Sequence, residues 1–263
     1  MSGLSGAGYF RQFHPYEGNK KEMTKSLAVI PARGGSKRIP RKNIKEFFGK
    51  PLIAYSIECA LRSGLFDRVI VSTEDKEIAG ISKKYGAEVP FFRPEELADD
   101  YSGTTDVVEH VLNELKRNGE EYDYECTIYP TAPFLREEFL RKGFDVLQGS
   151  DDAVYSFSAT SMPYPFQRSF RLTENGRSEM FFPEYYESRS QDLEEAYHDA
   201  GQFYWSNLKR LEKHKDDMIF SQISIPVILP RRFVIDIDTQ EDWEMAESMM
   251  AYMKNGDKVR NNE

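Results

Sequence analysis

The sequence predicts an α/β fold, in which a mainly parallel, twisted sheet carries helices on both faces and a small lobe is inserted late in the chain. Strand-like apolar runs alternate with segments of helical periodicity up to residue 159, and the alternation resumes at residue 201. Residues 160–200 are rich in aromatic residues and proline and show no clean period. Irregular segments of this length usually serve a function or an interface. We therefore expect one α/β domain over residues 24–159 and 201–256, with residues 160–200 as the inserted lobe.

Before the lobe, the predicted helices have recognisable ends. Pro51 opens a helix that Gly64 closes, and Asp75 caps the next helix, which Gly86 ends. Short apolar runs between such helices are typical of a parallel sheet. The predicted strands span residues 27–32, 68–73, 88–92, 124–129 and 153–158, and the predicted helices span residues 51–62, 75–85, 104–116 and 137–147.

Beyond the lobe, strand-like and helical segments return in an order that completes the same domain. Thr239 precedes a segment with Trp243 and Met250 at helical spacing, which predicts a capped final helix. The expected elements are a strand at residues 201–205, a short helix ending at His214, strands at residues 225–229 and 233–236, a helix at residues 240–254 and a flexible tail at residues 257–263.

The composition describes a globular protein and excludes several classes of function. Hydrophobic residues make up 40% of the 263 residues, which is enough for a core. The net charge of -9 argues against broad binding to nucleic acid or to anionic membranes. No apolar stretch approaches the roughly 18 residues of a membrane span. Cys59 and Cys126 form no metal-type pattern, so we expect reduced thiols in a cytoplasmic protein.

The first 23 residues contain several glycine and polar residues but no apolar core of signal-peptide length. We expect residues 1–23 to be a flexible leader or a remnant of expression, and not a secretion signal.

The segment from Pro31 to Lys50 concentrates positive charge. It holds seven basic residues against one acidic residue, a formal +6, so the remaining residues sum to -15. Gly34 and Gly35 let the backbone approach a ligand and point N–H groups at it. A loop of this kind after the first strand of an α/β sheet favours phosphate binding, and a solvated basic loop is the alternative. Neither the Walker motif nor the G-x-G-x-x-G fingerprint is present.

Residues 28–43, Ala-Val-Ile-Pro-Ala-Arg-Gly-Gly-Ser-Lys-Arg-Ile-Pro-Arg-Lys-Asn, resemble the opening signature of the CMP-sialic acid synthetase, or acylneuraminate cytidylyltransferase, family. The resemblance runs from about residue 27 to residue 252. It implies the Rossmann-like fold of nucleotide-diphospho-sugar transferases, with CTP as co-substrate. It also implies a nucleotide site that comprises Arg33, Gly34, Gly35, Ser36, Lys37, Lys42 and Asn43, of which Arg33 and Lys42 are catalytic.

Asp236 and Asp238 stand two residues apart near the C-terminus. On a strand, side chains at i and i+2 lie on the same face. Two carboxylates so placed repel each other unless a cation lies between them, and Mg²⁺ takes one or two carboxylates together with phosphate oxygens and water. The alternative is a helix cap at Asp238 or Thr239. The family places its catalytic, metal-binding Asp pair in the same context, which implies that both residues bind Mg²⁺.

Four further residues are expected around the bound substrates. Arg93 lies in a segment that resembles the family's segment after the third strand, which implies a substrate-binding role; a surface arginine is the alternative. Thr104 and Asp106 stand in a local helix-capping pattern, and the family's helix start also faces the ligands, so we expect Thr104 at the nucleotide and Asp106 at the substrate. Tyr129 replaces the Gln that sialic acid members typically carry before Pro-Thr, and we expect it at the nucleotide.

The segment over residues 189–205 resembles the branch of the family that acts on pseudaminic acid. The resemblance implies that Gln202 and Phe203 face the sugar, and amide and aromatic groups suit an acetamido sugar with a deoxy methyl group. Arg189 is expected to meet the sugar carboxylate. In relatives the inserted lobe crosses to the second subunit of a dimer. This implies a homodimer in which Arg168 or Arg189 completes the partner's site.

Together these observations predict a cytidylyltransferase that joins CTP to a nonulosonic acid, most simply pseudaminic acid, and releases pyrophosphate. Its partners are then CTP and the acid, with no nucleic acid and no membrane. The same reaction on N-acetylneuraminic, legionaminic or 3-deoxy-octulosonic acid is the nearest alternative. A glycosyltransferase that uses the D-x-D pair, or a nucleotide sensor without catalysis, is more distant.

Overall fold

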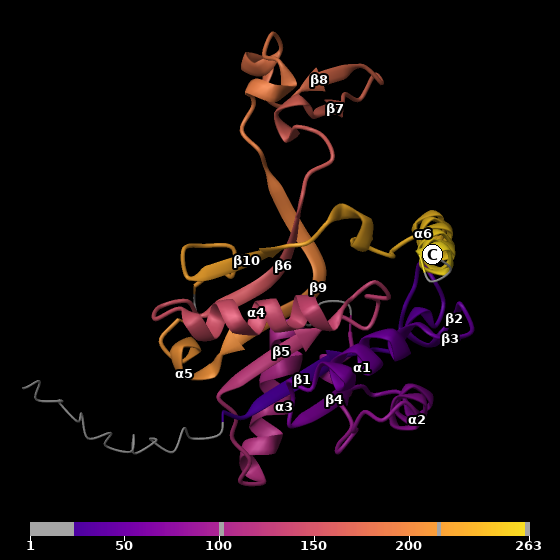
Figure 1. The fold of residues 1–263 in the computed structure, drawn as a ribbon, viewed down its shortest axis with the longest axis vertical. Coiled ribbons are helices and arrows are strands. Elements are labelled where there is room, and N and C mark those ends of the chain that lie inside the picture. Colours follow the sequence, from indigo (N-terminus) through magenta and orange to yellow (C-terminus); the bar gives the residue numbers. More distant parts are fainter. Residues whose placement is uncertain (1–23, 100–102, 215–216, 261–263) are drawn as a thin grey trace, which may run out of the picture.

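The computed structural model describes residues 24–99, 103–214 and 217–260, so the predicted leader lies outside the described residues. A six-stranded sheet with the order β10-β6-β9-β5-β1-β4 forms its centre (Figure 1). Only β9 runs antiparallel to its neighbours, so the prediction of a mainly parallel sheet is confirmed. The strands are β1 (Ser26–Pro31), β4 (Arg68–Ser72), β5 (Tyr124–Ile128), β6 (Tyr155–Ser161), β9 (Tyr197–Asn207) and β10 (Ser224–Ile228).

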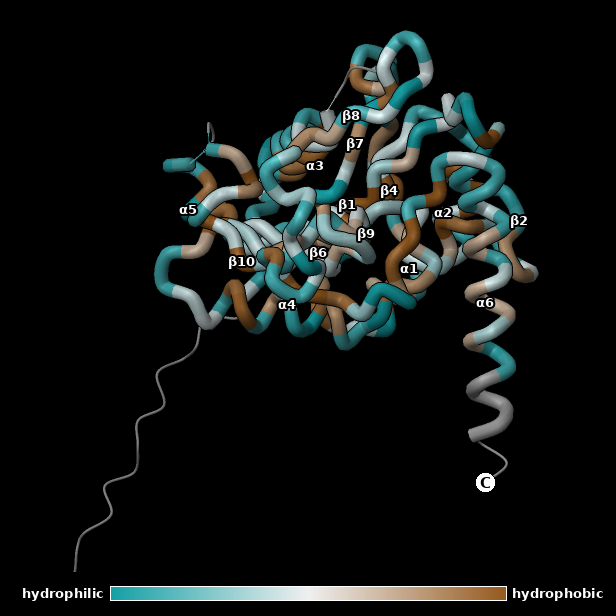
Figure 2. Tube along the Cα trace, turned by 90° about the horizontal axis from the view of Figure 1, so that it is seen from above, coloured by the Kyte–Doolittle hydropathy of each residue, from teal (hydrophilic) through white to brown (hydrophobic). Residues whose placement is uncertain are grey.

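Helices cover both faces of the sheet, with α1 and α4 on one face and α3 on the other (Figure 2). Residues 27–30 of the central strand β1 have no exposed surface. A parallel strand covered on both faces is apolar throughout, which explains its unbroken hydrophobic sequence. The helices are α1 (Leu52–Ser63), α2 (Lys76–Lys84), α3 (Thr104–Arg117), α4 (Glu137–Gly149), α5 (Leu208–Leu211) and α6 (Gln240–Arg260), and a small hairpin is formed by β2 (Glu46–Phe47) and β3 (Lys50–Pro51).

Local signals set several helix ends as predicted. Gly64 adopts a left-handed φ of 63°, and its N–H donates to the Leu61 carbonyl, which ends α1. The Asp75 carboxylate accepts the N–H groups of Glu77 and Ile78 at 2.9 and 3.0 Å and caps α2. The last helix, by contrast, extends beyond the predicted end and includes residues 257–260 of the expected tail.

The predicted strand at residues 88–92 does not form. Its backbone contributes a single bridge, between Glu88 and Ile70 of β4. Pro90 has no N–H to continue the ladder, so the contact ends there.

The predicted strand at residues 233–236 pairs with no strand in the described ranges either. The segment leaves a single 3-10 turn, η6 (Arg231–Phe233), and then crosses the edge of the sheet toward α6 (Figure 1). Its apolar residues still face inward, because Phe233 is 6% exposed and Ile237 is fully buried. The apolar residues of this segment therefore indicated burial correctly, but not strand pairing.

The inserted lobe projects from the sheet on the extended ends of β6 and β9 (Figure 1). Thr160 still pairs with His198 in these strands, so the lobe proper begins at residue 162 and ends at residue 196. It contains one hairpin, β7 (Phe170–Leu172) and β8 (Ser178–Met180), and several single turns of 3-10 helix.

Large apolar side chains of the lobe are exposed. Tyr164 is 79% exposed, Leu172 is 72% exposed and Tyr186 is 71% exposed. Exposed apolar clusters on soluble domains often mark contact surfaces.

Candidate active site

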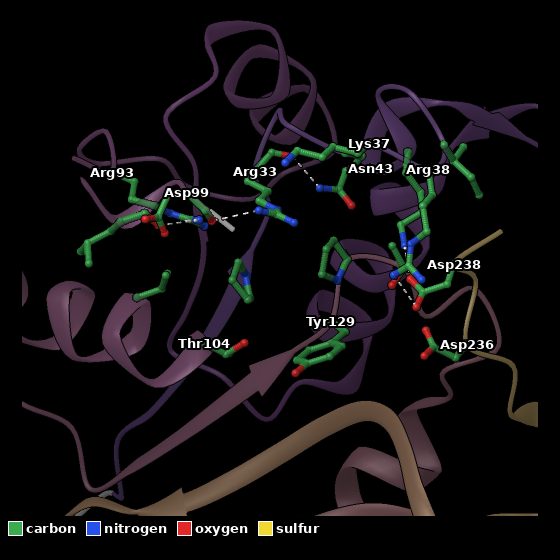
Figure 3. Close-up of a pocket in the computed structure, with 18 residues that line it drawn as sticks. Arg33, Lys37, Arg38, Asn43, Arg93, Asp99, Thr104, Tyr129, Asp236 and Asp238 are labelled. Atoms are coloured by element: carbon green, nitrogen blue, oxygen red, sulfur yellow. Dashed lines mark hydrogen bonds and ion pairs between the residues drawn. The ribbon is translucent and has the colours of Figure 1, made fainter. Parts of the chain in front are cut away.

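A cavity of about 630 Å³ lies where β1 and β5 end, and this volume is typical of small-molecule sites. The loop after β1 forms one wall, and the segment before α6 brings two carboxylates to another (Figure 3). Positions as far apart in sequence as 33 and 238 therefore share one cavity. The predicted site residues that line it are Arg33, Ser36, Lys37, Lys42, Asn43, Arg93, Thr104, Tyr129, Asp236 and Asp238.

Hydrogen bonds hold the basic loop in place. Asn43 Nδ2 donates to the Arg33 carbonyl at 2.9 Å, which ties the end of the loop to its beginning (Figure 3). Arg33 Nη1 donates to the Asp99 carbonyl on the neighbouring wall, also at 2.9 Å. Ser36 and Lys37 lie on the cavity lining between these two ties.

Gly34 has a different role from the one predicted. Neither Gly34 nor Gly35 is among the lining residues. The Gly34 N–H donates to Glu74 Oε1 at 2.6 Å and so does not point at a ligand. A Cβ at Gly34 would lie 2.6 Å from Asp75 Oδ2, so glycine is required for the close approach of the loop to the start of α2.

Arg41 fastens the loop to the same helix. Its guanidinium forms ion pairs with Asp75 and with Glu77, the latter at 2.6 Å. The hydrogen bond from Arg41 is the main cause that lowers the pKa of the Asp75 carboxyl to about 2. The charge of Arg41 is therefore paired with the carboxylates of α2 and its cap. Other basic residues supply the positive charge of the cavity.

The two carboxylates differ in their contacts. Asp238 accepts Arg38 Nη2 at 2.7 Å and Lys42 Nζ at 3.1 Å, so the basic loop already holds it (Figure 3). Asp236 forms no ion pair with another described residue. Burial and, next, the charge of Asp238 raise the pKa of the Asp236 carboxyl.

The donor set fits Mg²⁺ bound together with phosphate. The carboxylate repulsion that raises the pKa of Asp236 would be relieved by a cation between Asp236 and Asp238. Within the part of the chain that the structure describes, no group of three or more His, Cys, Asp or Glu side chains could hold a metal by itself. Further oxygen ligands would therefore come from phosphate and water, as is usual for Mg²⁺.

The opposite side of the cavity carries a buried arginine. Arg93 is 6% exposed, and its Nη2 donates to the Ser72 carbonyl at 2.5 Å. Burial lowers the pKa of its guanidinium. Thr104, the first residue of α3, lines the cavity beside it. Asp106 does not: its carboxylate accepts the Gly103 N–H at 3.0 Å and serves the helix start, which corrects its expected contact with substrate.

Along β9, the structure corrects the two residues expected at the sugar. Phe203 is fully buried and packs on α4, where a Cβ on Gly143 would lie 2.7 Å from its ring. Gln202 is 2% exposed, and its Nε2 donates to the Phe233 carbonyl at 2.5 Å. Tyr204 was not predicted, yet its ring contacts that of the cavity residue Tyr129, with 5.4 Å between centroids. Strand alternation would have indicated it, because side chains next to Phe203 point to the other face.

Neither of the two lobe arginines that were expected at the substrate, Arg168 and Arg189, lines the cavity of its own chain. Arg189 pairs with Asp192 at 2.7 Å, and Arg168 donates to the Ser188 carbonyl. Both contacts are local to the lobe.

Comparisons with known proteins agree with this geometry. The model of a family described as cytidylyltransferase matches residues 27–249. A pseudaminic acid cytidylyltransferase of Campylobacter jejuni is 48% identical over 223 residues, which are 85% of this chain and 95% of the relative. A CMP-N,N'-diacetyllegionaminic acid synthase of Legionella pneumophila is 34% identical over 231 residues, again 85% of this chain and 95% of the relative.

Among solved structures, a CMP:2-keto-3-deoxy-manno-octonic acid synthetase complexed with CTP aligns with a TM-score of 0.63 at 17% identity. The alignment covers 88% of this chain and 100% of that chain, which shows a shared fold. A family model that spans most of the chain, a relative of nearly half-identical sequence and this fold lead to one conclusion. The chain belongs to the cytidylyltransferase family, with CMP-sialic acid synthetases among its relatives.

Proposed function

We propose that this chain transfers the CMP group of CTP to the anomeric hydroxyl of pseudaminic acid and releases pyrophosphate. One observation carries the proposal: the basic loop after β1 and the Asp236–Asp238 pair line the same cavity. A triphosphate with about four negative charges needs a cationic cradle. A metal-assisted transfer of its α-phosphorus needs carboxylates beside that cradle.

The nucleotide would lie along the wall formed by the basic loop. Its phosphates would contact Arg33, Ser36, Lys37 and Lys42, and its base and ribose would lie toward Asn43, Thr104 and Tyr129. All of these residues line the cavity, and the hydrogen bonds of Asn43 and Arg33 give the wall a defined shape.

The reaction would occur where the two walls meet. Asp236 and Asp238 would hold Mg²⁺, which neutralises phosphate charge and orients the phosphates when it is bound. The anomeric hydroxyl attacks the α-phosphorus, and the bond to the pyrophosphate oxygen breaks. Arg33, Lys37 and Lys42 would stabilise the negative charge that develops on the leaving pyrophosphate.

The acid would lie beyond Tyr129, along the face of β9 that carries Tyr204. The Tyr204 hydroxyl donates to the Asp199 carboxylate, so this face offers both aromatic surface and hydrogen-bonding groups. Arg93, on the opposite wall, would bind substrate from the other side. Pseudaminic acid is the first choice because the 48% identical relative bears that name. Legionaminic or N-acetylneuraminic acid is the second, because a relative named for legionaminic acid is 34% identical.

We also propose that the lobe joins two copies of the chain. Its exposed Tyr164, Leu172 and Tyr186 are the kind of surface that a dimer covers. A partner lobe would then bring Arg168 or Arg189 toward the acid.

The proposed location is the cytoplasm, since Cys59 and Cys126 are both buried and free. In the described part of the chain, no helix combines the length and the apolar character needed to span a membrane.

Pyrophosphate release tests the proposal. The assay compares pseudaminic, legionaminic and N-acetylneuraminic acid with CTP and Mg²⁺, and mass spectrometry identifies the CMP-sugar. We expect release with pseudaminic acid. Asp236→Asn with Asp238→Asn should lower kcat at least roughly 100-fold, whereas Asp151→Asn with Asp152→Asn, an exposed acidic pair on a loop, should not.

Each other outcome identifies a different error. Release with another acid alone would refute the substrate. CTP binding without release with any of the acids would favour the sensor interpretation. Full Mg²⁺-dependent turnover of the double Asn variant would refute the role of the carboxylate pair.

A further inference from the structure

The pairing of β6 with β9 is interrupted by a bulge. Pairing between β6 and β9 passes from Phe157–Tyr204 to Ala159–Asp199, so the single residue Ser158 faces residues 200–203. Gly201, inside the bulge, adopts a left-handed φ of 60°. Bulges of this kind redirect side chains and are frequent beside active sites.

The bulge places Gln202 at the junction of three segments. Its N–H donates to Ser158 Oγ at 3.1 Å, and its carbonyl accepts the N–H of the cavity residue Tyr129 at 2.9 Å. Its side-chain Nε2 donates to the Phe233 carbonyl at 2.5 Å. The residue is 2% exposed and does not line the cavity, so it is enclosed by other residues of the protein.

The Phe233 carbonyl belongs to the segment that delivers Asp236. This segment pairs with no described strand, so no ladder of hydrogen bonds fixes its position relative to the sheet. The Leu229 N–H bonds to the Ala159 carbonyl at its start, and the Ile237 carbonyl accepts Lys42 Nζ near its end. Between these points, the bond from Gln202 to Phe233 ties the backbone of the segment to the sheet.

The position of the Asp236 carboxylate depends on this backbone. Asp238 is held by Arg38 and Lys42, whereas Asp236 forms no ion pair with another described residue. A carboxylate without partners of its own is placed by the chain that carries it. Displacements of about 1 Å at a reacting centre can cost about 100-fold in rate.

We propose that Gln202 is a positioning residue for Asp236. Through its hydrogen bond to Phe233, it fixes the position of the segment that carries Asp236, without contacting CTP or the acid. The inference rests on the proposed role of the carboxylate pair.

A second observation separates this role from simple packing. Gln202 Oε1 is buried and has no hydrogen-bond partner among the residues that the structure describes. A buried polar atom without a partner destabilises a fold, so packing alone would favour an apolar side chain of the same shape. Met has a similar shape, but it lacks the Nε2 donor that bonds to the Phe233 carbonyl.

The test uses Gln202→Met, with Gln167→Met as the matched control. Gln167 is 3% exposed, its Nε2 donates to the Glu194 carbonyl at 3.1 Å, and its Oε1 likewise has no partner in the described part of the chain. It lies in the lobe, away from the cavity lining. Both variants should change the melting temperature by similar amounts. Titration calorimetry with Mn²⁺ and CTP, without acid substrate, should show Mn²⁺ affinity weakened roughly 10- to 100-fold in Gln202→Met and unchanged in Gln167→Met.

A double-mutant cycle identifies the residue through which Gln202 acts. In an Asp236→Asn background, Gln202→Met should change Mn²⁺ affinity and kcat by less than about threefold, because the group that it positions is already lost. Wild-type Mn²⁺ affinity and kcat in Gln202→Met, or full additivity in the cycle, would overturn the inference alone. If Asp236→Asn itself leaves Mn²⁺ affinity unchanged, the proposed metal site is wrong and the inference is refuted with it.

Discussion

Glu125 is a carboxylic acid in the middle of the sheet. It lies on β5, is 2% exposed and accepts a hydrogen bond from Thr127 Oγ1 at 2.7 Å. Burial raises the pKa of its carboxyl from 4.5 to about 8, against the smaller opposing effects of hydrogen bonds from Thr127 and Ser206. The folded protein therefore holds a proton on Glu125 at pH values where the unfolded chain has released it.

The sign of the pH dependence follows directly. The stability associated with Glu125 is greatest below pH 4.5, falls as the pH rises toward 8 and then levels off. The difference between a pKa of 4.5 and one of about 8 corresponds to about 5 kcal/mol in the free energy of unfolding. About 3 kcal/mol of this is lost between pH 5 and pH 8. That loss is a large fraction of the 5–15 kcal/mol by which typical domains are stable.

Glu125→Gln removes the titration and keeps the shape and the acceptor for Thr127. Urea unfolding at pH 5 and pH 8 should show that the variant gains about 3 kcal/mol over wild type from the lower to the higher pH. Any constant cost of the amide cancels in this difference. The matched control is Glu121→Gln, because the Glu121 side chain is 75% exposed. An advantage of Glu125→Gln that is the same at both pH values would refute the reasoning.

Two glycine positions give further predictions. Gly34→Ala brings a Cβ within 2.6 Å of the carboxylate that caps α2, so we expect about 1–3 kcal/mol lower stability in urea unfolding and about tenfold weaker CTP binding in calorimetry. Gly35→Ala, with no atom within 4 Å, should change stability by less than about 0.5 kcal/mol, and equal effects of the two would contradict the packing argument. Gly143→Ala places a Cβ 2.7 Å from the ring of Phe203 and should cost about 1–3 kcal/mol, measured by the same unfolding. Gly149→Ala, at the end of the same helix, places its Cβ within 4 Å of no described atom and is the control; because Ala has a higher helix propensity than Gly, a comparable loss there would refute the overpacking argument.

Features that depend on near neighbours in the chain could be predicted from the sequence. Asp75 directly precedes the helix that it caps, and Gly64 directly follows the helix that it ends. The apolar run of β1 likewise indicates that this strand is buried. The basic loop and the carboxylate pair were predicted separately, each from its own segment. The family resemblance then indicated that they act together, and both line one cavity.

The partners that these residues contact could not be predicted, because they come from distant parts of the chain. The N–H of Gly34 meets Glu74, 40 positions away, and Gln202 meets Phe233, 31 positions away. Residues 233–236 have the apolar character of a strand, but they pair with no strand that the structure describes and cross the edge of the sheet. An apolar pattern along a chain indicates which residues are buried, whereas pairing and hydrogen-bond partners depend on segments that are distant in sequence and meet only when the chain folds.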